Sequence, residues 1–319
     1  MPRNEQYAIG VDLGGTSIKL GIVSRKGKII KKVSKDTRAA EGPQVIIKQM
    51  LKGITALLEG EKFRIEGIGI GAPGVVSSKK GTVENAPNLP GWGKVHLGKI
   101  ISDKTGLRCV VENDANAAAI GEMIFGSGKN YDSFVMVTLG TGVGGGIILN
   151  KKLFKGEFGA AGELGHITID HAGHKCNCGS YGCIEAYLGN SYLIERVKER
   201  LEDAPESMIN RIIKSGSRQL SPEVISEAAA AGDPFAVDFI RESGRLLGYA
   251  MASVSNLLDV STIIIGGGVA GFGKTLTDSV KEGMTQRVLK SLQPRVKVLR
   301  AKLKNEAGIK GASSLVFYK

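Results

Sequence analysis

Two stretches of the chain repeat one pattern, and this repeat constrains the fold more than any other feature. Residues 9–23 read IGVDLGGTSIKLGIV and residues 135–149 read VMVTLGTGVGGGIIL. Each stretch combines an apolar strand, a Gly/Thr turn and a second apolar strand. A repeated supersecondary unit predicts two similar lobes. We place a small lobe at residues 1–114 and a large lobe at 115–304, and we expect a C-terminal helix, about 305–319, to return to the small lobe.

Strand and helix patterns alternate along the chain, which is typical of the α/β fold class. A helix should begin at Pro43, because apolar residues recur every three or four positions after it. A second helix should run on from Ala115, and a mostly apolar helix should cover 244–258. The expected strands are 7–13, 17–24, 28–36, 65–72, 108–114 and 261–268.

Composition and charge narrow the class of protein. The chain is 42% hydrophobic, yet no apolar run approaches the roughly 18 residues that a membrane helix needs. The N-terminus, MPRNEQYAIG, lacks the apolar core of a signal peptide. The formal charge of +12 would suit nucleic acid, but the basic residues fall in separate turns rather than in one stripe. We therefore expect a cytoplasmic protein without membrane or nucleic-acid partners.

The turns of the two repeated hairpins share one chemistry. Asp12–Thr16 reads DLGGT and Thr138–Gly142 reads TLGTG. Glycine lets the backbone turn sharply, so that N–H groups converge on phosphate oxygens, and threonine adds a hydroxyl donor. Asp12, at the end of a strand, is a candidate ligand for Mg²⁺. Either loop alone is equally well a simple hairpin turn, but two matched copies favour a nucleotide site.

Two glycine patterns match the dinucleotide motif G-x-G-x-x-G without its context. No helix follows Gly69–Gly74, and Pro73 lacks the N–H group that would face a phosphate. A helix does follow Gly266–Gly271, but no acid stands about 20 residues further on to hold a ribose. We therefore predict no dinucleotide site at either pattern.

A third glycine pattern, GVAGFGKT at 268–275, matches the P-loop. Only 44 residues remain after Thr275, too few for the further strands of a P-loop domain. We expect the glycines of this segment to pack instead against an adenosine.

Three of the four cysteines lie within eight residues, at Cys176, Cys178 and Cys183. In a cytoplasmic protein such a cluster favours a metal over disulfides, and the spacing suits a Cys₃His zinc site better than three free thiols. Three upstream histidines, His166, His171 and His174, are candidates for the fourth ligand, and spacing does not choose among them. Cys109 lies in an apolar strand and is expected to be a buried hydrophobe.

Two glutamates, Glu163 and Glu185, stand at the two ends of the cysteine segment. A zinc ion with four protein ligands has a closed shell and does not activate water. Such an ion would instead fix the segment. We expect it to hold the two carboxylates rigidly as acceptors for sugar hydroxyls.

A further polar cluster, Glu112-Asn113-Asp114, follows an apolar strand and precedes an alanine-rich helix. Ligands gather at the carboxyl ends of strands in α/β sheets. Asp114 is a candidate ligand-binding acid at this strand end, but it also stands where a helix cap is needed. Asn113 offers both a donor and an acceptor to a polyol.

The ordered motifs resemble the ROK family (repressors, open reading frames and sugar kinases) and, within it, the bacterial ATP-dependent glucokinases. The resemblance covers nearly the whole chain. The zinc segment and the ENDANAAAIGE segment carry most of the specificity. The matching motifs are DLGGTSIK (12–19), GIGAPG (69–74), ENDANAAAIGE (112–122), TLGTGVGGGI (138–147), GELGH (162–166), CNCGSYGCIE (176–185) and IIIGGGV (263–269).

The resemblance implies an actin-like, ribonuclease H-like duplicated fold with two lobes around a central cleft. It implies a structural Zn²⁺ held by His166, Cys176, Cys178 and Cys183. It also implies a hexose site with Asp114 as the general base, formed with Gly71, Asn88, Asn113, Glu163, His166 and Glu185.

For the nucleotide, the resemblance implies ATP and Mg²⁺ as cofactors. The residues implied for this site are Asp12, Gly14, Gly15, Thr16, Lys19, Thr138, Gly140, Thr141, Gly142, Gly266, Gly267 and Gly268. The family also suggests a homodimer or a homotetramer.

The expected function is ATP-dependent phosphorylation of glucose at its 6-hydroxyl. Kinases for N-acetylmannosamine, N-acetylglucosamine, fructose or allose are alternatives, because one group on a sugar changes binding by only about 1–3 kcal/mol. A sugar-responsive repressor of the same family is a rival from another class. Such repressors carry a winged helix-turn-helix before the sugar-binding fold, and we expect none here because the first strand begins near Tyr7.

Overall fold

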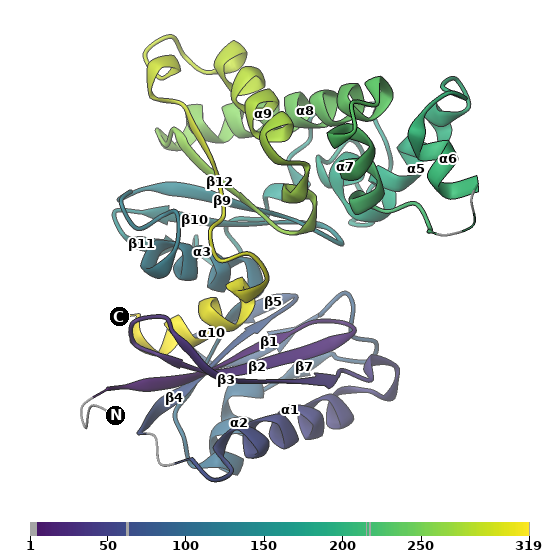
Figure 1. Cartoon of the computed structure of the whole chain (residues 1–319). Helices are drawn as coiled ribbons and strands as arrows, with labels where there is room; N and C mark the ends of the chain where they lie inside the picture. Colours follow the sequence, from purple (N-terminus) through teal and green to yellow (C-terminus); the bar gives the residue numbers. More distant parts are fainter. Residues whose placement is uncertain (1–4, 62–63, 215, 217, 319) are drawn as a thin grey trace. The chain divides into compact units, whose positions relative to one another are not determined.

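The computed structural model of the chain describes residues 5–61, 64–214, 216 and 218–318 (Figure 1). It divides into two compact units. The first comprises Met1–Asp132, Gly146–Gly162 and Lys302–Lys319, and the second comprises Ser133–Gly145 and Glu163–Ala301. These units do not coincide with the lobes expected from the sequence, whose boundary stays a prediction.

A five-stranded sheet with the strand order β3-β2-β1-β4-β8 forms the centre of the first unit. Its strands are β1 (Tyr7–Leu13), β2 (Ser17–Ser24), β3 (Ile29–Asp36), β4 (Ile65–Ala72) and β8 (Cys109–Asn113). Strands β1, β2 and β3 are antiparallel neighbours, whereas β4 is parallel to both β1 and β8. The carboxyl ends of β1, β4 and β8 therefore lie at one edge of the sheet.

Helices cover both faces of this sheet (Figure 1). Helices α1 (Pro43–Leu58) and α2 (Leu97–Thr105) pack on one face, and α10 (Ala307–Phe317) packs on the other. A Cβ atom at Gly69 of β4 would lie 1.8 Å from the carbonyl oxygen of Ala312, so α10 packs directly on the strand backbone. Helix α3 (Asp114–Phe125) packs beside α10.

A small three-stranded sheet follows β4 in the first unit. It consists of β5 (Val75–Ser77), β6 (Thr82–Glu84) and β7 (Lys94–Val95) in the order β5-β6-β7. The turn between β6 and β7 carries Asn88. No strand was expected here from the sequence, because these strands are short and Gly/Pro-rich turns interrupt any period.

The second large sheet has the order β11-β10-β9-β12-β13, and β9, β12, β13 and residues 143–145 of β10 belong to the second unit. The bounds are β9 (Phe134–Leu139), β10 (Val143–Leu149), β11 (Lys152–Phe154), β12 (Thr262–Gly266) and β13 (Lys297–Arg300). Strand β12 is parallel to β9, with Gly266 opposite Thr138. The two loops that follow these strands therefore begin side by side.

Among its described residues, the second unit contains six α-helices. They are α4 (Glu185–Leu188), α5 (Asn190–Leu201), α6 (Met208–Lys214), α7 (Pro222–Ala230), α8 (Pro234–Leu258) and α9 (Gly273–Arg287). The long helix α8 and α9 form the most extensive helix pair, and glycines bring their backbones together. Among the described residues, no helix has the length and apolarity required to cross a bilayer.

Candidate active site

The structure places the predicted site residues in two groups, one in each unit. The first unit holds Asp12, Gly14, Gly15, Thr16, Lys19, Gly71, Asn88, Asn113 and Asp114. The second unit holds Thr138, Gly140, Thr141, Gly142, Glu163, His166, Cys176, Cys178, Cys183, Glu185, Gly266, Gly267 and Gly268.

Strand register brings the first group to one edge of the sheet. Asp12 of β1 is opposite Gly71 of β4, and Gly71 is opposite Glu112 of β8. A Cβ atom at Gly71 would lie 3.5 Å from the Cα atom of Asp114, so these two residues are neighbours. The sequence prediction that ligand residues gather at these strand ends agrees with this geometry.

Asn113, rather than Asp114, is the N-cap of α3. The Asn113 side chain accepts hydrogen bonds from the backbone N–H groups of Ala115 at 3.0 Å and Asn116 at 3.2 Å, and its own amide donates to the carbonyl of Gly74 at 3.3 Å. Asp114 is the first residue of the helix, is exposed, and accepts from the N–H of Ala115 at 2.8 Å. Because Asn113 caps the helix, capping does not account for Asp114.

Sequence reasoning missed the role of Glu112, the other acidic residue of the same cluster. Its side chain is buried and accepts from Ser78 Oγ at 2.7 Å, Lys155 Nζ at 2.5 Å and the Asn113 N–H at 3.0 Å, and also from Asn116 Nδ2 at 3.2 Å. These bonds fix the backbone just before the cap. The sequence feature that could have indicated this role is an acidic residue within an apolar strand, because a buried carboxylate needs hydrogen-bond partners.

Replacing Glu112 with Gln should destabilise the protein by about 2 kcal/mol. The change leaves the ammonium of Lys155 without its charged partner. Loss of one partner from a fully buried pair costs about 3–5 kcal/mol, and the exposed part of Lys155 reduces this cost. Chemical denaturation measures the effect. Glu84→Gln is the control, because Glu84 pairs with Lys94 at 2.6 Å on the surface and should change stability by less than about 1 kcal/mol. Equal losses of stability in Glu112→Gln and Glu84→Gln would contradict a stabilising role for the Glu112–Lys155 pair.

The loop Asp12–Thr16 is held in a fixed shape. The Gly14 N–H donates to the Ser17 carbonyl at 3.1 Å, and Thr37 Oγ1 donates to the Gly14 carbonyl at 2.6 Å. A Cβ atom at Gly15 would lie 3.1 Å from Cβ of Asn88, so the loop and the predicted sugar residue Asn88 are neighbours. The backbone of the glycine loop is therefore ordered by hydrogen bonds at Gly14.

Burial raises the pKa of the Asp12 carboxyl, and the nearby Lys19 ammonium opposes that rise. Lys19 is opposite Asp12 in the β1–β2 ladder. The Asp12 carboxylate lies against Gly308 of α10, where a Cβ atom would be 2.1 Å from Oδ2. A divalent cation at this carboxylate would favour its charged form, so Asp12 is suited chemically to hold Mg²⁺.

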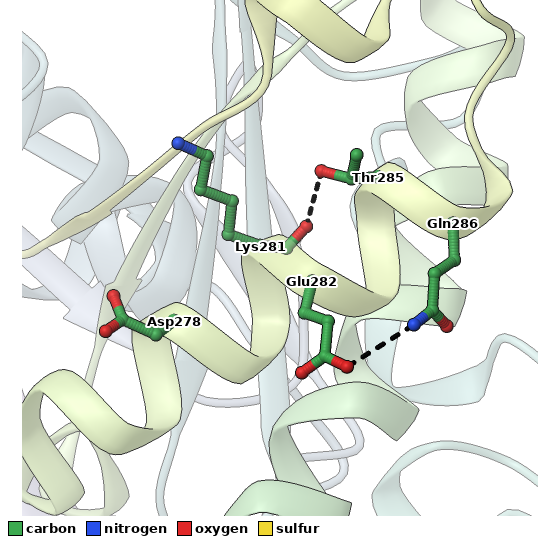
Figure 2. Close-up of a pocket in the computed structure, with 5 residues that line it drawn as sticks. All are labelled: Asp278, Lys281, Glu282, Thr285 and Gln286. Carbon is green, nitrogen blue, oxygen red and sulfur yellow. Dashed lines mark hydrogen bonds between the residues drawn. The ribbon is translucent and has the colours of Figure 1, made fainter.

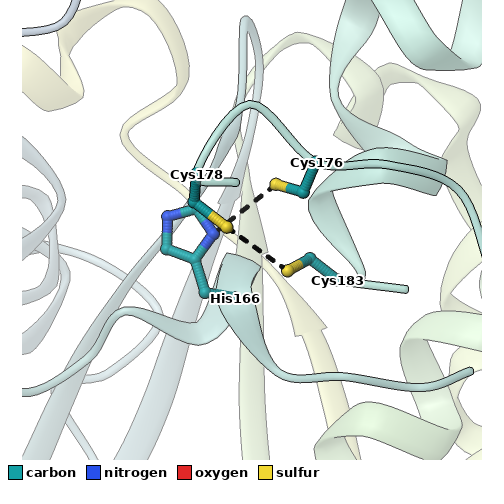
Figure 3. A group of neighbouring side chains, drawn as sticks. All are labelled: His166, Cys176, Cys178 and Cys183. Carbon is teal, nitrogen blue, oxygen red and sulfur yellow. Dashed lines mark hydrogen bonds between the residues drawn. The ribbon is translucent and has the colours of Figure 1, made fainter. Parts of the chain in front are cut away.

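In the second unit, the structure selects His166 as the fourth member of the cysteine cluster (Figure 3). The ligand atoms of His166, Cys176, Cys178 and Cys183 all lie within 4.8 Å of one another. His166 Nδ1 is 3.8 Å from Cys176 Sγ, and Cys178 Sγ is 3.6 Å from Cys183 Sγ. Zn–S bonds near 2.3 Å in a tetrahedron place sulfurs about 3.8 Å apart. The cluster therefore fits Zn²⁺.

The other two candidate histidines are not members of this group. His171 is exposed, and the ring of His174 packs edge-on against Tyr187 with centroids 4.9 Å apart. The hydroxyl of Tyr187 donates to Asp170 at 3.4 Å, and the guanidinium of Arg196 donates to the Tyr187 carbonyl at 3.0 Å. These contacts anchor the cysteine segment to the body of the unit.

The thiols of the cluster need a cation in order to ionise together. Burial raises the pKa of Cys183 to about 12, and burial also raises that of Cys176. A hydrogen bond from the Ser180 backbone lowers the pKa of Cys178. Cys109 of β8 was expected to be a buried hydrophobe, but it is only partly buried, and burial raises its pKa to about 12.

The two glutamates beside the cluster have different surroundings. Glu163 is exposed and immediately precedes a 3₁₀ helix, η2 (Leu164–His166). Glu185 begins α4 and is half-buried, and its Oε2 accepts from the backbone N–H of Val143 at 2.9 Å. Glu185 therefore touches the second glycine loop.

The two glycine segments of the second unit lie together. Gly267 has φ +87°, and a Cβ atom there would lie 2.1 Å from the Leu139 carbonyl. Beyond it a cavity of about 280 Å³ is bordered by α7 and by the 3₁₀ helix η3 (Gly268–Phe272). The residues lining this cavity are Pro222, Glu223, Ser226, Glu227, Ala230, Gly268 and Gly271. A cavity lined in part by Gly268 and Gly271, beside a phosphate-type loop, suits the adenosine half of a nucleotide.

The surroundings of Lys274 agree with the prediction that residues 268–275 do not form a P-loop. Helix η3 occupies the segment that would wrap a phosphate in a P-loop, and Lys274 lies in the first turn of α9. Its ammonium is 3.7 Å from the Asp278 carboxylate, and both side chains are exposed. The lysine is thus on the surface of the helix.

Lys274→Ala should leave turnover within about twofold of the wild-type value, because an exposed ion pair contributes little. Steady-state kinetics measures this. Loss of all turnover would restore the P-loop interpretation.

A hollow on the surface of α9 lies outside both groups of predicted site residues. It has a volume of about 440 Å³ and is lined by Asp278, Lys281, Glu282, Thr285 and Gln286 (Figure 2). Its polar groups bond along the helix, since Thr285 Oγ1 donates to the Lys281 carbonyl at 2.8 Å and Gln286 Nε2 donates to Glu282 at 3.4 Å. None of the predicted site residues lines it.

Comparisons with known proteins identify a family that matches nearly the whole chain. The model of the ROK family matches residues 8–319. A glucokinase of Streptomyces coelicolor is 37% identical over 310 residues, which cover 96% of this chain and 96% of that protein. A xylose repressor of Caldicellulosiruptor bescii is 30% identical over 312 residues, which cover 97% of this chain and 77% of that protein.

Among solved structures, a ROK family glucokinase from Streptomyces griseus, in complex with glucose and AMPPNP, superposes with a TM-score of 0.85. It is 39% identical and covers 97% of this chain and 98% of its own. This likeness confirms the predicted α/β, actin-like fold class.

Proposed function

The chain belongs to the ROK family, and we propose that it transfers the terminal phosphoryl group of ATP to the 6-hydroxyl of glucose. Relatives named glucokinase align over almost their whole length, and one similar structure holds glucose and an ATP analogue. The site residues given by the resemblance stand in the two groups described above. The function of each of them in this chain is part of the proposal.

The observation that carries the proposal is the position of Asp114 at the end of β8. Asn113 caps α3, so the exposed carboxylate of Asp114 is not needed to start the helix. Asp114 also neighbours Gly71. Gly71 is paired with Asp12 of β1, where the first glycine loop begins. A carboxylate beside a phosphate-type loop is the arrangement that general-base catalysis of phosphoryl transfer requires.

In the proposed reaction, Asp114 accepts the proton of the 6-hydroxyl as its oxygen attacks the γ-phosphorus. The new P–O bond forms as the bond to the bridging oxygen of ADP breaks. General-base assistance of this kind contributes about 10²–10⁴-fold. Backbone N–H groups of the two glycine loops position the phosphates. Asp12 would hold Mg²⁺, which neutralises phosphate charge when bound.

The proposed sugar-binding residues are the ones that the resemblance implies, and each has its place within its own unit. Asn113 and Asp114 belong to the first, and Glu163, His166 and Glu185 belong to the second. Since His166 faces Cys176 through Nδ1, its Nε2 is available to bond a sugar hydroxyl. Zn²⁺ held by the four-residue cluster supplies a rigid support for these side chains and no chemistry of its own.

The repressor relative makes a second function worth testing. A protein that binds sugar without transferring phosphate would use the same sugar residues but would have no use for a base at Asp114. Phosphoryl transfer therefore separates the two functions.

A coupled assay for ADP with glucose, N-acetylglucosamine, N-acetylmannosamine, fructose and allose tests the proposal. We expect the highest kcat/KM for glucose. A higher value for another hexose would change the substrate but keep the kinase. Absence of transfer to every sugar, with sugar binding intact, would favour the repressor-like function.

A further inference from the structure

We propose that Glu185 couples the zinc cluster to the second glycine loop, so that the bound metal controls affinity for the nucleotide as well as for the sugar. This inference rests on the proposed function, in which the loop Thr138–Gly142 binds phosphate and the cluster supports the sugar. The contacts that carry it all lie within the second unit.

One oxygen of Glu185 is bonded to the end of the loop. Its Oε2 accepts from the Val143 N–H at 2.9 Å. The same oxygen lies over Gly142, where a Cβ atom would be only 2.3 Å away. Glycine at 142 is therefore required for the carboxylate to reach the loop, and the carboxylate in turn fixes the backbone there.

The other oxygen of Glu185 faces the cluster. Its Oε1 lies 3.8 Å from Cys176 Sγ. Glu185 also follows Cys183 by two residues, and the Ala186 N–H donates to the Cys183 carbonyl at 2.9 Å. A metal that fixes Cys176 and Cys183 would therefore fix the position of the glutamate.

The residues after Glu185 hold the loop at further points. The Gly189 N–H bonds to the Glu185 carbonyl at 2.8 Å, and the Asn190 N–H bonds to the Gly140 carbonyl at 2.9 Å. A Cβ atom at Gly189 would lie 3.2 Å from the Thr141 carbonyl. The segment 185–190 thus braces the loop from Gly140 to Val143.

One carboxylate can perform both tasks. Its two oxygens offer about four acceptor positions, so the bond to the Val143 N–H leaves room for a sugar hydroxyl. Glu185, which the proposed function assigns to the sugar, is therefore also a positioning residue for the nucleotide. Sugar and nucleotide binding share a single support whose geometry depends on the metal.

Calorimetric titration with Mg·AMP-PNP, with and without saturating glucose, tests the inference. The proteins are the zinc-loaded protein, the same protein after removal of zinc by a chelator, and Glu185→Ala. We expect zinc removal and Glu185→Ala each to weaken AMP-PNP binding about tenfold, the size typical of one lost charge-assisted hydrogen bond. Zinc removal should have little further effect in Glu185→Ala, because the coupling is already broken.

Two further variants separate positioning from a loss of fold. Glu185→Gln keeps an oxygen that can accept from the Val143 N–H, so it should restore most of the AMP-PNP affinity that Glu185→Ala loses. Glu163→Gln is the matched control, because Glu163 is exposed and lies directly before η2, so this variant should affect glucose binding alone.

Equal AMP-PNP affinity in the zinc-loaded and zinc-free proteins would overturn the inference, even if glucose binding falls. Failure of the Gln variant to restore binding would also overturn it. Failure of the proposed function gives another result, namely no phosphoryl transfer by the intact protein.

Discussion

Replacing Asp114 with Asn should lower kcat by about 10²–10⁴-fold while glucose binding stays measurable. The amide has nearly the shape of the carboxylate but cannot accept the hydroxyl proton. The fold should survive, because Asn113 supplies the helix cap. Loss of one negative charge in the first turn of α3 should cost less than about 1 kcal/mol.

Asp278→Asn is a matched control, since Asp278 is an exposed aspartate on α9 outside both groups of site residues. Steady-state kinetics gives kcat, and calorimetry with glucose gives the sugar affinity. The expected result is a large fall in kcat for Asp114→Asn alone. Retained turnover would refute the role of Asp114 as the base.

Replacing Cys178 with Ser should release zinc and weaken glucose binding by about 100-fold. Changes around a metal site typically cost about 10–100-fold in metal affinity or activity, and loss of a thiolate ligand belongs at the upper end. Without the ion, the side chains of Cys176 and Cys183 have no common ligand, and the segment that carries His166 and Glu185 loses the support that the metal would give it.

Cys109→Ala is the control for the cysteine chemistry, because Cys109 lies in β8 and takes no part in the cluster. Zinc content by mass spectrometry and glucose affinity by calorimetry are measured on both variants. A zinc-free Cys178→Ser protein with normal affinity for glucose would show that the metal does not organise the sugar site.

Local patterns predicted much of the fold. The strands expected at 7–13 and 17–24 have these bounds in the structure, because an apolar run on each side of a glycine turn determines a hairpin. The strand expected at 108–114 ends at Asn113, because Asp114 already belongs to α3. The sheet β5-β6-β7 could not be predicted, since its strands have two or three residues and no readable period.

The site was predictable in its residue types but less so in its contacts. Spacing indicated a Cys₃His cluster, yet three-dimensional packing was needed to select His166, because His174 packs on Tyr187 instead. The partners of Glu112 and Glu185 come from distant segments. Lys155 is 43 residues from Glu112, and Val143 is 42 residues from Glu185. Such contacts depend on topology, and a local pattern does not contain them.

The central claim is that one glucose molecule contacts both the zinc-supported residues and the proposed base. A crystal structure of the protein with glucose and Mg·AMP-PNP tests it most directly. We predict the 6-hydroxyl oxygen within about 3 Å of an Asp114 carboxylate oxygen, with Glu163, His166 and Glu185 bonded to other hydroxyls of the same ring. A glucose ring bound elsewhere, or a 6-hydroxyl beyond hydrogen-bond distance of Asp114, would contradict the account.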